Sequence, residues 1–280
     1  MSTPEATVKH ALADAFKQGL ERLDAQLLLL HALGRQPGDR AWLIAHDTDA
    51  LAADIKDHFT GLCARRATGE PLAYLTGRQA FYGLELQVDH RVLIPRPDTE
   101  TLVDWALAIL EGATEPAVLD LGTGSGAIAL ALKHERPDAR VSGLDASPDA
   151  LKVAAGNAAR LKLDVDFSAG SWLAGVGGSY HLIVSNPPYI AAGDCHLPAL
   201  SHEPSQALVS GVDGLDDIRT IIEAAPAKLQ SDGWLLLEHG YDQAVAVRAL
   251  LAGAGFIEVH SRRDLAGMER CSGGKLPRLG

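Results

Sequence analysis

A glycine-rich segment that directly follows an apolar run limits the folds open to this chain. Residues 117–121 read Ala-Val-Leu-Asp-Leu, and Gly122, Gly124 and Gly126 follow in alternation before a helical pattern begins. Glycine tolerates the positive φ angles of a tight turn, and it leaves no Cβ between the backbone and a ligand. The segment therefore predicts a buried strand, a turn that binds a nucleotide-type cofactor, and the start of a helix.

The glycine spacing alone leaves the kind of cofactor open. Read as Gly122-x-Gly124-x-x-Ala127, it also satisfies the relaxed dinucleotide fingerprint, so an NAD-dependent dehydrogenase and a structural turn without a ligand are alternatives. A P-loop is excluded because no Gly-Lys-Ser/Thr follows. A nucleophile elbow is excluded because Thr123 stands where the first glycine of Gly-x-Ser-x-Gly is required.

Strand and helix patterns alternate through the rest of the chain after residue 97. Asp98 is a good N-cap for a helix whose apolar face includes Leu102 and Trp105. Strands are expected at 117–121, 140–145, 163–167, 181–185, 233–238 and 256–260, and helices at 126–135, 148–162, 214–229 and 241–253. This alternation predicts an α/β fold with a mostly parallel sheet, helices on its faces, and a binding crevice at the carboxyl ends of the strands.

In the first part of the chain, apolar residues recur at other spacings. Between Thr7 and about Gly69, apolar residues recur every three or four positions, which predicts a small helical bundle. From 79 to 95 the period becomes two, with a turn-like Asp89-His90-Arg91, which predicts a β-hairpin linker. We therefore expect a helical domain over residues 1–77, a hairpin linker over 78–97 and an α/β domain over 98–280.

The charge balance disfavours a partner that is bound mainly through phosphates. The sequence has 25 Lys and Arg against 36 Asp and Glu, a formal net charge of -11, whereas phosphate binding depends on clustered cations. A local basic groove remains an alternative, and it would draw on Arg65, Arg66, Arg262 and Arg263. We expect no direct nucleic-acid partner.

Cysteine and histidine positions give no metal signal. Cys63, Cys195 and Cys271 share no metal-ligand spacing, and their odd number fits a reducing compartment. His196 and His202 match no metal motif either. The first 18 residues contain no apolar leader, and no later run approaches the ~20 apolar residues of a membrane helix. We expect a cytoplasmic protein without a metal and without membrane contact.

Two aspartates at strand ends narrow the choice of cofactor. Asp145 ends the second expected strand, where a carboxylate can accept hydrogen bonds from both hydroxyls of an adenosine ribose. NAD-dependent enzymes bind their ribose in the same way, so Asp145 does not distinguish NAD from S-adenosylmethionine. Asp120 precedes the glycines, and its carboxylate suits the ammonium group of S-adenosylmethionine but would repel a pyrophosphate. The pair favours S-adenosylmethionine.

The segment Asn186-Pro187-Pro188-Tyr189 follows an apolar strand at 182–185, which places it at a carboxyl end of the sheet beside the glycine loop. A plain turn is the alternative, because Asn and Pro are common in turns. Methylation of a conjugated NH2 group requires that its nitrogen be held in line with the sulfonium methyl and that delocalisation of its lone pair be opposed. Hydrogen-bond acceptors perform both tasks.

This segment supplies such acceptors. The Asn186 side-chain oxygen can accept one N–H and the Pro187 carbonyl the other. The proline rings stiffen the turn, and Tyr189 offers a flat face for stacking. The sequence thus predicts a methyltransferase that acts on a planar amide or amine nitrogen, with Asn186, Pro187 and Tyr189 as catalytic residues.

Over nearly its whole length the chain resembles HemK-like class I S-adenosylmethionine methyltransferases of the release factor glutamine methyltransferase (PrmC) type. The resemblance rests on residues 94–100 (Ile-Pro-Arg-Pro-Asp-Thr-Glu), 120–127, 186–190, Glu203-Pro204 with Ala207-Leu208, 211–215 (Gly-Val-Asp-Gly-Leu) and 236–240 (Leu-Leu-Glu-His-Gly). Ser125 stands where a threonine is more usual, a small change that leaves cofactor binding in place.

The resemblance implies a Rossmann-like, seven-stranded, mostly parallel sheet that ends in an antiparallel strand at 268–271, preceded by a small helical domain that helps to hold the protein substrate. The substrate would be the glutamine of the Gly-Gly-Gln loop of class 1 peptide chain release factors, methylated on its side-chain nitrogen (N5), with S-adenosylhomocysteine as the other product.

The same resemblance assigns site residues by position. The cofactor would contact Gly122, Thr123, Gly124, Ser125, Gly126, Asp145, Trp172 and Asn186, and the glutamine would contact Asn186, Pro187, Pro188 and Tyr189. Trp172 fits as a lid on the adenine, with core packing as the alternative. The long loop over 191–213 is expected to cover the substrate.

Two other functions compete with this assignment. An adenine-N6 methyltransferase that acts on DNA or RNA would need the same acceptor pair and stacking face, together with a basic surface. A release-factor-binding module without activity would need a degraded cofactor loop or acceptor turn, and both segments are intact in the sequence.

Overall fold

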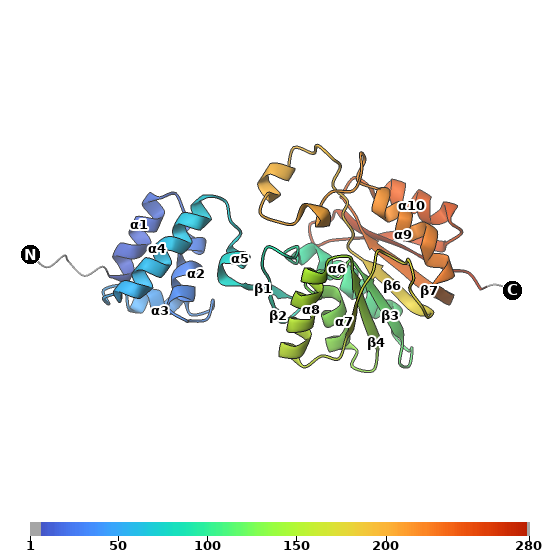
Figure 1. Ribbon diagram of the computed structural model, residues 1–280, viewed down its shortest axis with the longest axis horizontal. Coiled ribbons are helices and arrows are strands. Elements are labelled where there is room, and N and C mark those ends of the chain that lie inside the picture. The colour runs from blue at the N-terminus through green and yellow to red at the C-terminus, as the bar shows by residue number, and fades with distance from the viewer. Residues whose placement is uncertain (1–6, 279–280) are drawn as a thin grey trace, which may run out of the picture. The chain divides into compact units, whose positions relative to one another are not determined.

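The computed structural model describes residues 7–278, which divide into one compact unit up to Arg78 and a second unit from Gln79 onward (Figure 1). Residues 1–6 of the expected helical domain and residues 279–280 of the expected α/β domain lie outside the described residues. The boundary between the units falls one residue inside the expected hairpin linker.

The first unit is helical, as its three-to-four residue period predicts. Its helices are α1 (Val8–Lys17), α2 (Arg22–Ala32), α3 (Arg40–Ala45), α4 (Ala53–Ala67) and α5 (Leu72–Thr76). Their apolar faces enclose a core that includes Leu28, Leu29 and Phe59. Thr7 caps α1 by accepting a hydrogen bond from the backbone N–H of His10, and Gly77 ends α5 in the left-handed conformation.

A short hairpin of β1 (Arg78–Phe81) and β2 (Leu84–Gln87) follows, but its turn lies elsewhere than expected. The predicted turn at 89–91 does form, since the Val92 N–H donates to the Asp89 carbonyl at 3.1 Å, but it is not the turn of the hairpin, because no strand follows it before residue 97. The chain turns at Tyr82 and Gly83, whose φ angles are 47° and 74°. Two positive φ angles are what a two-residue hairpin turn requires.

Distant contacts explain why local sequence preferences did not predict this turn. The Tyr82 backbone N–H donates to Glu100 Oε1 at 2.8 Å, and the Tyr82 hydroxyl donates to Asp104 Oδ1 at 2.6 Å. These bonds hold in place a tyrosine that local preference would not choose for a positive φ.

The second unit contains a seven-stranded sheet with the order β5-β4-β3-β6-β7-β9-β8. The strands are β3 (Ala117–Leu121), β4 (Arg140–Asp145), β5 (Asp166–Ala169), β6 (Tyr180–Ser185), β7 (Leu229–Glu238), β8 (Ile257–Arg263) and β9 (Glu269–Lys275). β9 is antiparallel to both of its neighbours, and the pairs from β5 to β7 are parallel. The Rossmann-like class I methyltransferase fold is confirmed.

Some element ends differ from the predictions. The helix expected over 214–229 is α9 (Asp216–Ala224), followed by a 3-10 turn, η4 (Ala225–Ala227), because Pro226 has no N–H to continue the helix. β7 therefore begins at Leu229 and not at 233. The strand expected over 163–167 runs over 166–169, since its ladder with β4 starts where Asp166 pairs with Ser142.

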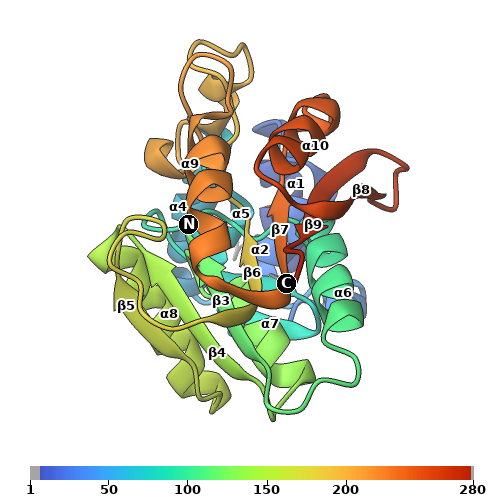
Figure 2. The same cartoon turned by 90° about the vertical axis from the view of Figure 1, so that its right-hand side faces the viewer.

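Helices cover both faces of the sheet (Figure 2). On β3, Val118 faces the core formed with α6 (Glu100–Ile109) and α7 (Ala127–Glu135), whereas Leu119 faces the core formed with α9 and α10 (Ala244–Gly253). α8 (Pro148–Leu161) lies beside α7 on the first face. The alternation of side chains along a strand produces the two cores. Both helical layers leave the carboxyl ends of the strands to the loops.

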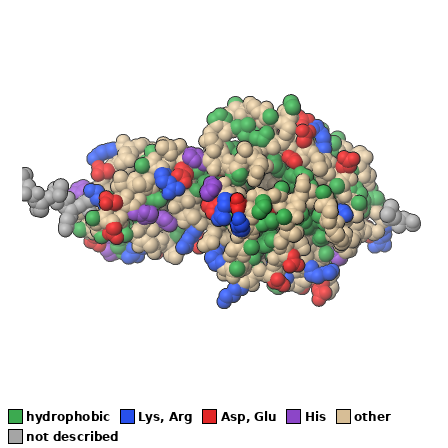
Figure 3. Space-filling view, viewed as in Figure 1, with side chains coloured by type: hydrophobic (Ala, Val, Ile, Leu, Met, Phe, Trp, Pro, Cys, Tyr) green, Lys and Arg blue, Asp and Glu red, His purple; other side chains and the backbone are tan. Residues whose placement is uncertain are grey.

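Charged side chains of both signs are mixed on the face drawn in Figure 3. Of the arginines considered for a basic groove, Arg65 binds Glu70 and Arg66 binds Asp24 in the first unit. In the second unit, Arg262 lies 5.0 Å from the centre of the Trp105 ring. Arg65 and Arg66 thus have carboxylate partners. Between residues 7 and 278, no helix has the length and apolar character of a membrane span.

Gly143 on β4 offers a test of the packing beneath the glycine loop. A Cβ at this position would lie 2.7 Å from the Phe167 ring and 2.9 Å from Thr123 Oγ1. Gly143→Ala should therefore lower the free energy of unfolding by about 1–3 kcal/mol in urea titrations. The control is Gly156→Ala on α8, where the added methyl meets nothing within 4 Å. Equal stability of the two variants would contradict this packing.

Candidate functional site

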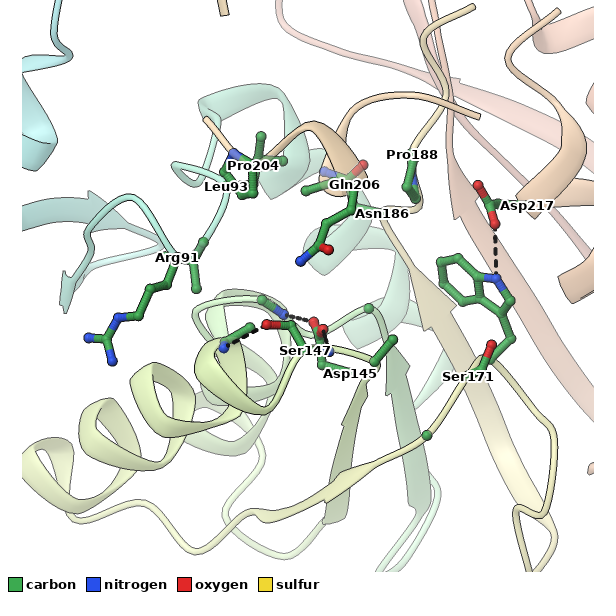
Figure 4. Close-up of a pocket in the computed structure, with 18 residues that line it drawn as sticks. Arg91, Leu93, Asp145, Ser147, Ser171, Asn186, Pro188, Pro204, Gln206 and Asp217 are labelled. Atoms are coloured by element: carbon green, nitrogen blue, oxygen red, sulfur yellow. Dashed lines mark hydrogen bonds between the residues drawn. The ribbon is translucent and has the colours of Figure 1, made fainter. Parts of the chain in front are cut away.

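A cavity of about 250 Å³ opens at the carboxyl ends of β3, β4 and β6 (Figure 4). β4 and β6 flank β3 on opposite sides, so the cavity lies where the strand order reverses, the usual ligand site of such sheets. Its lining contains the glycine loop, the end of β4, the turn after β6, and parts of the chain after β2 and of the loop over 191–213. The lining residues among the sequence candidates are Gly122, Gly124, Asp145, Trp172, Asn186 and Pro188.

The glycine loop has the backbone conformation that its sequence predicts. Gly122, Gly124 and Gly126 have φ angles of 66°, 57° and 82°, all in the left-handed region. At Gly122 a Cβ would lie 3.4 Å from the Trp172 ring. The bare backbone of Gly122 and Gly124 forms one wall of the cavity, which lets a ligand approach closely.

Asp145 is held in a fixed orientation at the end of β4. Its Oδ2 accepts a hydrogen bond from the Gly124 N–H at 2.9 Å, and its Oδ1 accepts one from the Ser147 N–H at 2.8 Å. Each carboxylate oxygen has further acceptor capacity. The side chain lines the cavity, so it can also accept two hydroxyl groups of a ligand.

Asp120 lies beneath the loop and does not line the cavity. Its Oδ2 accepts hydrogen bonds from the Thr123 hydroxyl at 2.6 Å and from the Ala129 N–H at 3.3 Å. Its Oδ1 is buried and has no hydrogen-bond partner among residues 7–278. Burial raises the pKa of Asp120 to about 7, against the lowering effect of the two hydrogen bonds.

The raised pKa of Asp120 predicts a pH-dependent stability. The folded state keeps this proton up to about pH 7, whereas the unfolded carboxyl ionises near 3.8, so between these values the folded state binds more protons. The stability of the ligand-free protein should then fall, relative to Asp120→Asn, by on the order of 1 kcal/mol per pH unit as the pH rises.

Urea titrations between about pH 4 and pH 7 measure this difference. Asp149→Asn is the control, because Asp149 is exposed and its Lys152 partner lowers its pKa, which puts its titration below this range. A difference between wild type and Asp120→Asn that stays constant with pH would contradict the buried proton.

Thr123, Ser125 and Gly126 shape the loop and do not line the cavity. The Thr123 hydroxyl donates a hydrogen bond to Asp120 Oδ2, and the Ser125 carbonyl accepts one from Asn157 Nδ2 at 3.0 Å. Asn157, on α8, also exchanges two hydrogen bonds with the backbone of Gln87. Asn157 was not among the predicted site residues, because its only signal in the sequence is that it is a polar residue on the apolar face of a helix.

Asn186 carries an unused acceptor. Its Nδ2 donates to Thr99 Oγ1 at 3.2 Å, while its Oδ1 is buried and has no hydrogen-bond partner among the described residues. In Figure 4 the carboxamide points into the cavity, toward the side of Asp145 and Ser147. A buried amide oxygen without a partner is costly unless a ligand supplies one.

The rest of the turn is anchored to the sheet. Pro187 and Pro188 are buried, and Pro188 lines the cavity. The Tyr189 hydroxyl donates to Glu238 Oε1 at 3.3 Å, and the Tyr189 carbonyl accepts from Gln243 Nε2 at 3.0 Å. Tyr189 and Pro187 do not line the cavity, so stacking of Tyr189 on a substrate stays a prediction.

Trp172 has surroundings that fit both of its predicted roles, and its role as a lid on the adenine stays a prediction. It lines the cavity and also packs against the core beneath α9. Its indole N–H donates to Asp217 Oδ1 at 3.0 Å, and this bond fixes the orientation of the ring. The φ angle of Trp172 is 48°, a left-handed value that is uncommon for residues other than glycine. Asp217, in the first turn of α9, also lines the cavity. It was missed because an acidic residue at a helix start is ordinary.

The loop over 191–213 reaches the cavity because Glu203 holds it. The Glu203 side chain is buried, and it accepts a hydrogen bond from the Ile94 N–H at 3.1 Å and another from the Arg96 guanidinium. Pro204, Gln206 and Ala207 then line the cavity. This agrees with a covering role for the loop.

One group in the same loop has donors suited to a metal ion. The side chains of Asp194, Cys195 and His196 have possible ligand atoms within 4.8 Å of one another. Cys195 and His196 are exposed, and His196 Nδ1 lies 2.7 Å from Asp194 Oδ1. Two of the possible ligand atoms are therefore hydrogen-bonded to each other. Cys63 and Cys271 are buried in the cores of the two units.

Comparisons with known proteins identify the family of this chain. Residues 103–244 match the family model of the methyltransferase small domain, and residues 6–77 match that of the PrmC N-terminal domain. A methyltransferase from Pyrococcus furiosus has the same fold, with a TM-score of 0.54 at 17% identity over 78% of this chain and all of that one (100%).

Relatives of much higher identity cover nearly the full length. A release factor glutamine methyltransferase from Burkholderia pseudomallei is 51% identical over 92% of this chain and 93% of its own. One from Xylella fastidiosa is 49% identical over 95% of this chain and 98% of its own. The chain belongs to the release factor glutamine methyltransferase family.

Proposed function

We propose that this protein transfers the methyl group of S-adenosylmethionine to the side-chain nitrogen (N5) of the glutamine in the Gly-Gly-Gln loop of class 1 release factors. The observation that carries the proposal is the Asn186 carboxamide, which points into the cavity beside the glycine loop and whose buried Oδ1 has no hydrogen-bond partner among the described residues. The names of the relatives agree with a glutamine in a release factor as the substrate.

The cavity fits S-adenosylmethionine on several grounds. The oriented carboxylate of Asp145 can accept both ribose hydroxyls, and the bare backbone at Gly122 and Gly124 permits close approach. Trp172 provides an apolar ring at the same wall. Asp120 Oδ1 is buried below the loop without a hydrogen-bond partner among the described residues, and the carboxyl suits a cation once it has lost its proton, so we assign it to the ammonium end. When bound, the cofactor supplies an electrophilic methyl group on its sulfonium.

The acceptor turn would prepare the nitrogen of the substrate. An amide nitrogen is a poor nucleophile because its lone pair is delocalised into the carbonyl. Asn186 Oδ1 accepts one N–H and the Pro187 carbonyl accepts the other, which fixes the nitrogen and opposes that delocalisation. The nitrogen gains the methyl group and releases one proton to water, so the residues at the turn need not act as a base.

In this proposal the second unit carries out the methyl transfer and the helical unit binds the protein substrate. The second unit contains the cavity and all of the candidate site residues. The helical unit, which matches the PrmC N-terminal domain, would bind the release factor away from its glutamine. Binding energy from a remote part of a substrate can position its reacting group.

Transfer of a labelled methyl group separates the substrate classes. Purified protein and methyl-labelled S-adenosylmethionine are incubated in parallel with a bacterial release factor, with adenine-containing DNA and with RNA. We expect label in the release factor alone. Label in nucleic acid, with binding that weakens steeply as salt increases, would instead favour the adenine-N6 methyltransferases.

A further inference from the structure

The acceptor turn, residues 186–189, is anchored at its end by a side chain from another segment. Pro187 and Pro188 have no N–H, so the backbone cannot donate hydrogen bonds at these two positions. The Tyr189 carbonyl, at the end of the turn, accepts a hydrogen bond from Gln243 Nε2 at 3.0 Å. Gln243 does not line the cavity, and the proposed mechanism gives it no task.

Gln243 joins three segments of the chain. Its Nε2 donates to the Tyr189 carbonyl and also, at 3.3 Å, to the carbonyl of Asp213, which ends the loop over 191–213. Its Oε1 accepts a hydrogen bond at 2.8 Å from the N–H of Gly240, just after β7. The Gln243 N–H donates to the Gly240 carbonyl at 2.9 Å, so two hydrogen bonds fix this residue at the start of α10.

The partners of the Gln243 carboxamide determine its orientation. A backbone carbonyl can only accept a hydrogen bond, and a backbone N–H can only donate one. The NH2 group therefore faces the carbonyls of Tyr189 and Asp213, and the oxygen faces the Gly240 N–H. The opposite orientation would place an oxygen against two carbonyls and an NH2 group against an N–H, and these groups would lose their hydrogen bonds.

The backbone packs closely around the Tyr189 carbonyl. Gly214, the residue after Asp213, has a φ angle of 78°. A Cβ at Gly214 would lie 2.2 Å from the Tyr189 carbonyl oxygen and 2.7 Å from Gln243 Nε2. Only a glycine leaves room for both groups, so the hydrogen bond from Gln243 to Tyr189 is enclosed by the chain.

We propose that Gln243 is a positioning residue that, through the Tyr189 carbonyl, holds the acceptor turn in the shape that directs the Pro187 carbonyl at the substrate. The inference rests on the proposed function, in which that carbonyl accepts an N–H of the substrate amide. The rings of Pro187 and Pro188 fix φ at both positions. Few backbone angles then remain free within the turn, so holding its two ends, at Asn186 and Tyr189, also fixes the carbonyl between them.

Gln243→Glu removes the donor of this side chain and keeps its acceptor. The carboxylate can still accept the Gly240 N–H, but it has no proton to give to the carbonyls of Tyr189 and Asp213. We expect kcat to fall by about 10-fold to 100-fold, the effect of a misaligned group at a reacting centre. The KM for the release factor and the Kd for S-adenosylmethionine should stay within about threefold of wild type, because Gln243 touches neither ligand.

Gln243→Met shows whether the added charge is the cause. It removes the donor without introducing a carboxylate, and it should give a loss of kcat in the same range. Gln230→Glu is the matched control, because Gln230 Nε2 also donates to a backbone carbonyl, that of Ser179 at 3.1 Å, but near the opposite end of β7. This variant should keep kcat within about twofold of wild type.

Three results would overturn the inference. One is wild-type kcat in both Gln243 variants. Another is a loss of kcat in Gln230→Glu equal to that in Gln243→Glu. The third is a rise in the Kd for S-adenosylmethionine as large as the loss of kcat, which would show general damage to the site.

Amide hydrogen exchange, followed by NMR, tests the same contact without any substrate. The Ile190 N–H, directly after the turn, donates to the Leu208 carbonyl at 2.9 Å. Because Gln243 holds the preceding residue, this N–H should exchange at least about tenfold faster in Gln243→Glu and Gln243→Met than in wild type and Gln230→Glu. Equal exchange in all four proteins would show that the turn keeps its place without Gln243.

The two readouts keep this inference apart from the proposed function. If wild type does not methylate a release factor, the proposed function fails, and exchange at Ile190 still decides whether Gln243 holds the turn. If wild type is active but the Gln243 variants match it in kcat and in exchange, the positioning role is wrong and the proposed function stands.

Discussion

Asn186→Ala should lower kcat for glutamine methylation by about 10²–10³-fold, the loss found when one preorganised hydrogen-bonding group at a reacting centre is removed. The reason is that Asn186 Oδ1 is already buried and has no hydrogen-bond partner within residues 7–278, while Thr99 orients its carboxamide. Water therefore need not be removed from this oxygen when the substrate binds. An acceptor of this kind is most effective in a site that excludes water.

The same variant should bind S-adenosylmethionine with a Kd within about tenfold of wild type, since one neutral hydrogen bond contributes about 1 kcal/mol. Single-turnover kinetics and calorimetry measure the two effects separately. Asn186→Asp is the matched control, because it keeps the shape and an acceptor oxygen but loses the N–H to Thr99, and it should be intermediate in kcat. Wild-type turnover by Asn186→Ala would show that the acceptor turn does not prepare the substrate nitrogen.

Asp145→Ala should raise the Kd for S-adenosylmethionine by at least about 100-fold, because hydrogen bonds to a charged group contribute about 1.5–3 kcal/mol each and the ribose offers two hydroxyls. The variant also leaves the N–H groups of Gly124 and Ser147 without their acceptor, which loosens both sides of the cavity.

Asp149→Ala is the control for Asp145→Ala. Asp149 lies four residues further along the chain, is exposed and pairs with Lys152, and it is absent from the cavity wall. Calorimetric titration should give the wild-type Kd for this variant. If both variants bound the cofactor equally well, Asp145 would not be the ribose ligand.

Local patterns predicted the central part of the fold closely. The strand at 117–121 and the helix after it came out within one residue, because the apolar run and the positive-φ glycines are signals carried by the segment itself. The hairpin turn was misplaced because Tyr82 is held by Glu100 and Asp104, about twenty residues away. Side-chain contacts between residues so far apart in the sequence do not change the spacing of apolar residues, from which the turn was predicted.

For the candidate site, the sequence predicted residues that line the cavity but not those that hold them in place. Gly122, Gly124, Asp145 and Asn186 were found because a carboxyl end of a parallel strand is recognisable from sequence, and all four line the cavity. The residues behind them were given no role in the site, although Glu203, Thr99 and Glu238 lie in segments that carry the family resemblance. Glu203 meets Ile94 across 109 positions. Asn157, Thr99, Asp217 and Glu238 likewise have partners that only the fold brings near.

Tandem mass spectrometry of the Gly-Gly-Gln peptide tests the central claim most directly. A bacterial release factor is incubated with this protein and S-adenosylmethionine, digested, and compared with a sample treated with Asn186→Ala. A single added methyl group on the side-chain nitrogen of that glutamine, much reduced with the variant, is the predicted result. A peptide that stays unmethylated, or a methyl group on another residue, would contradict the account.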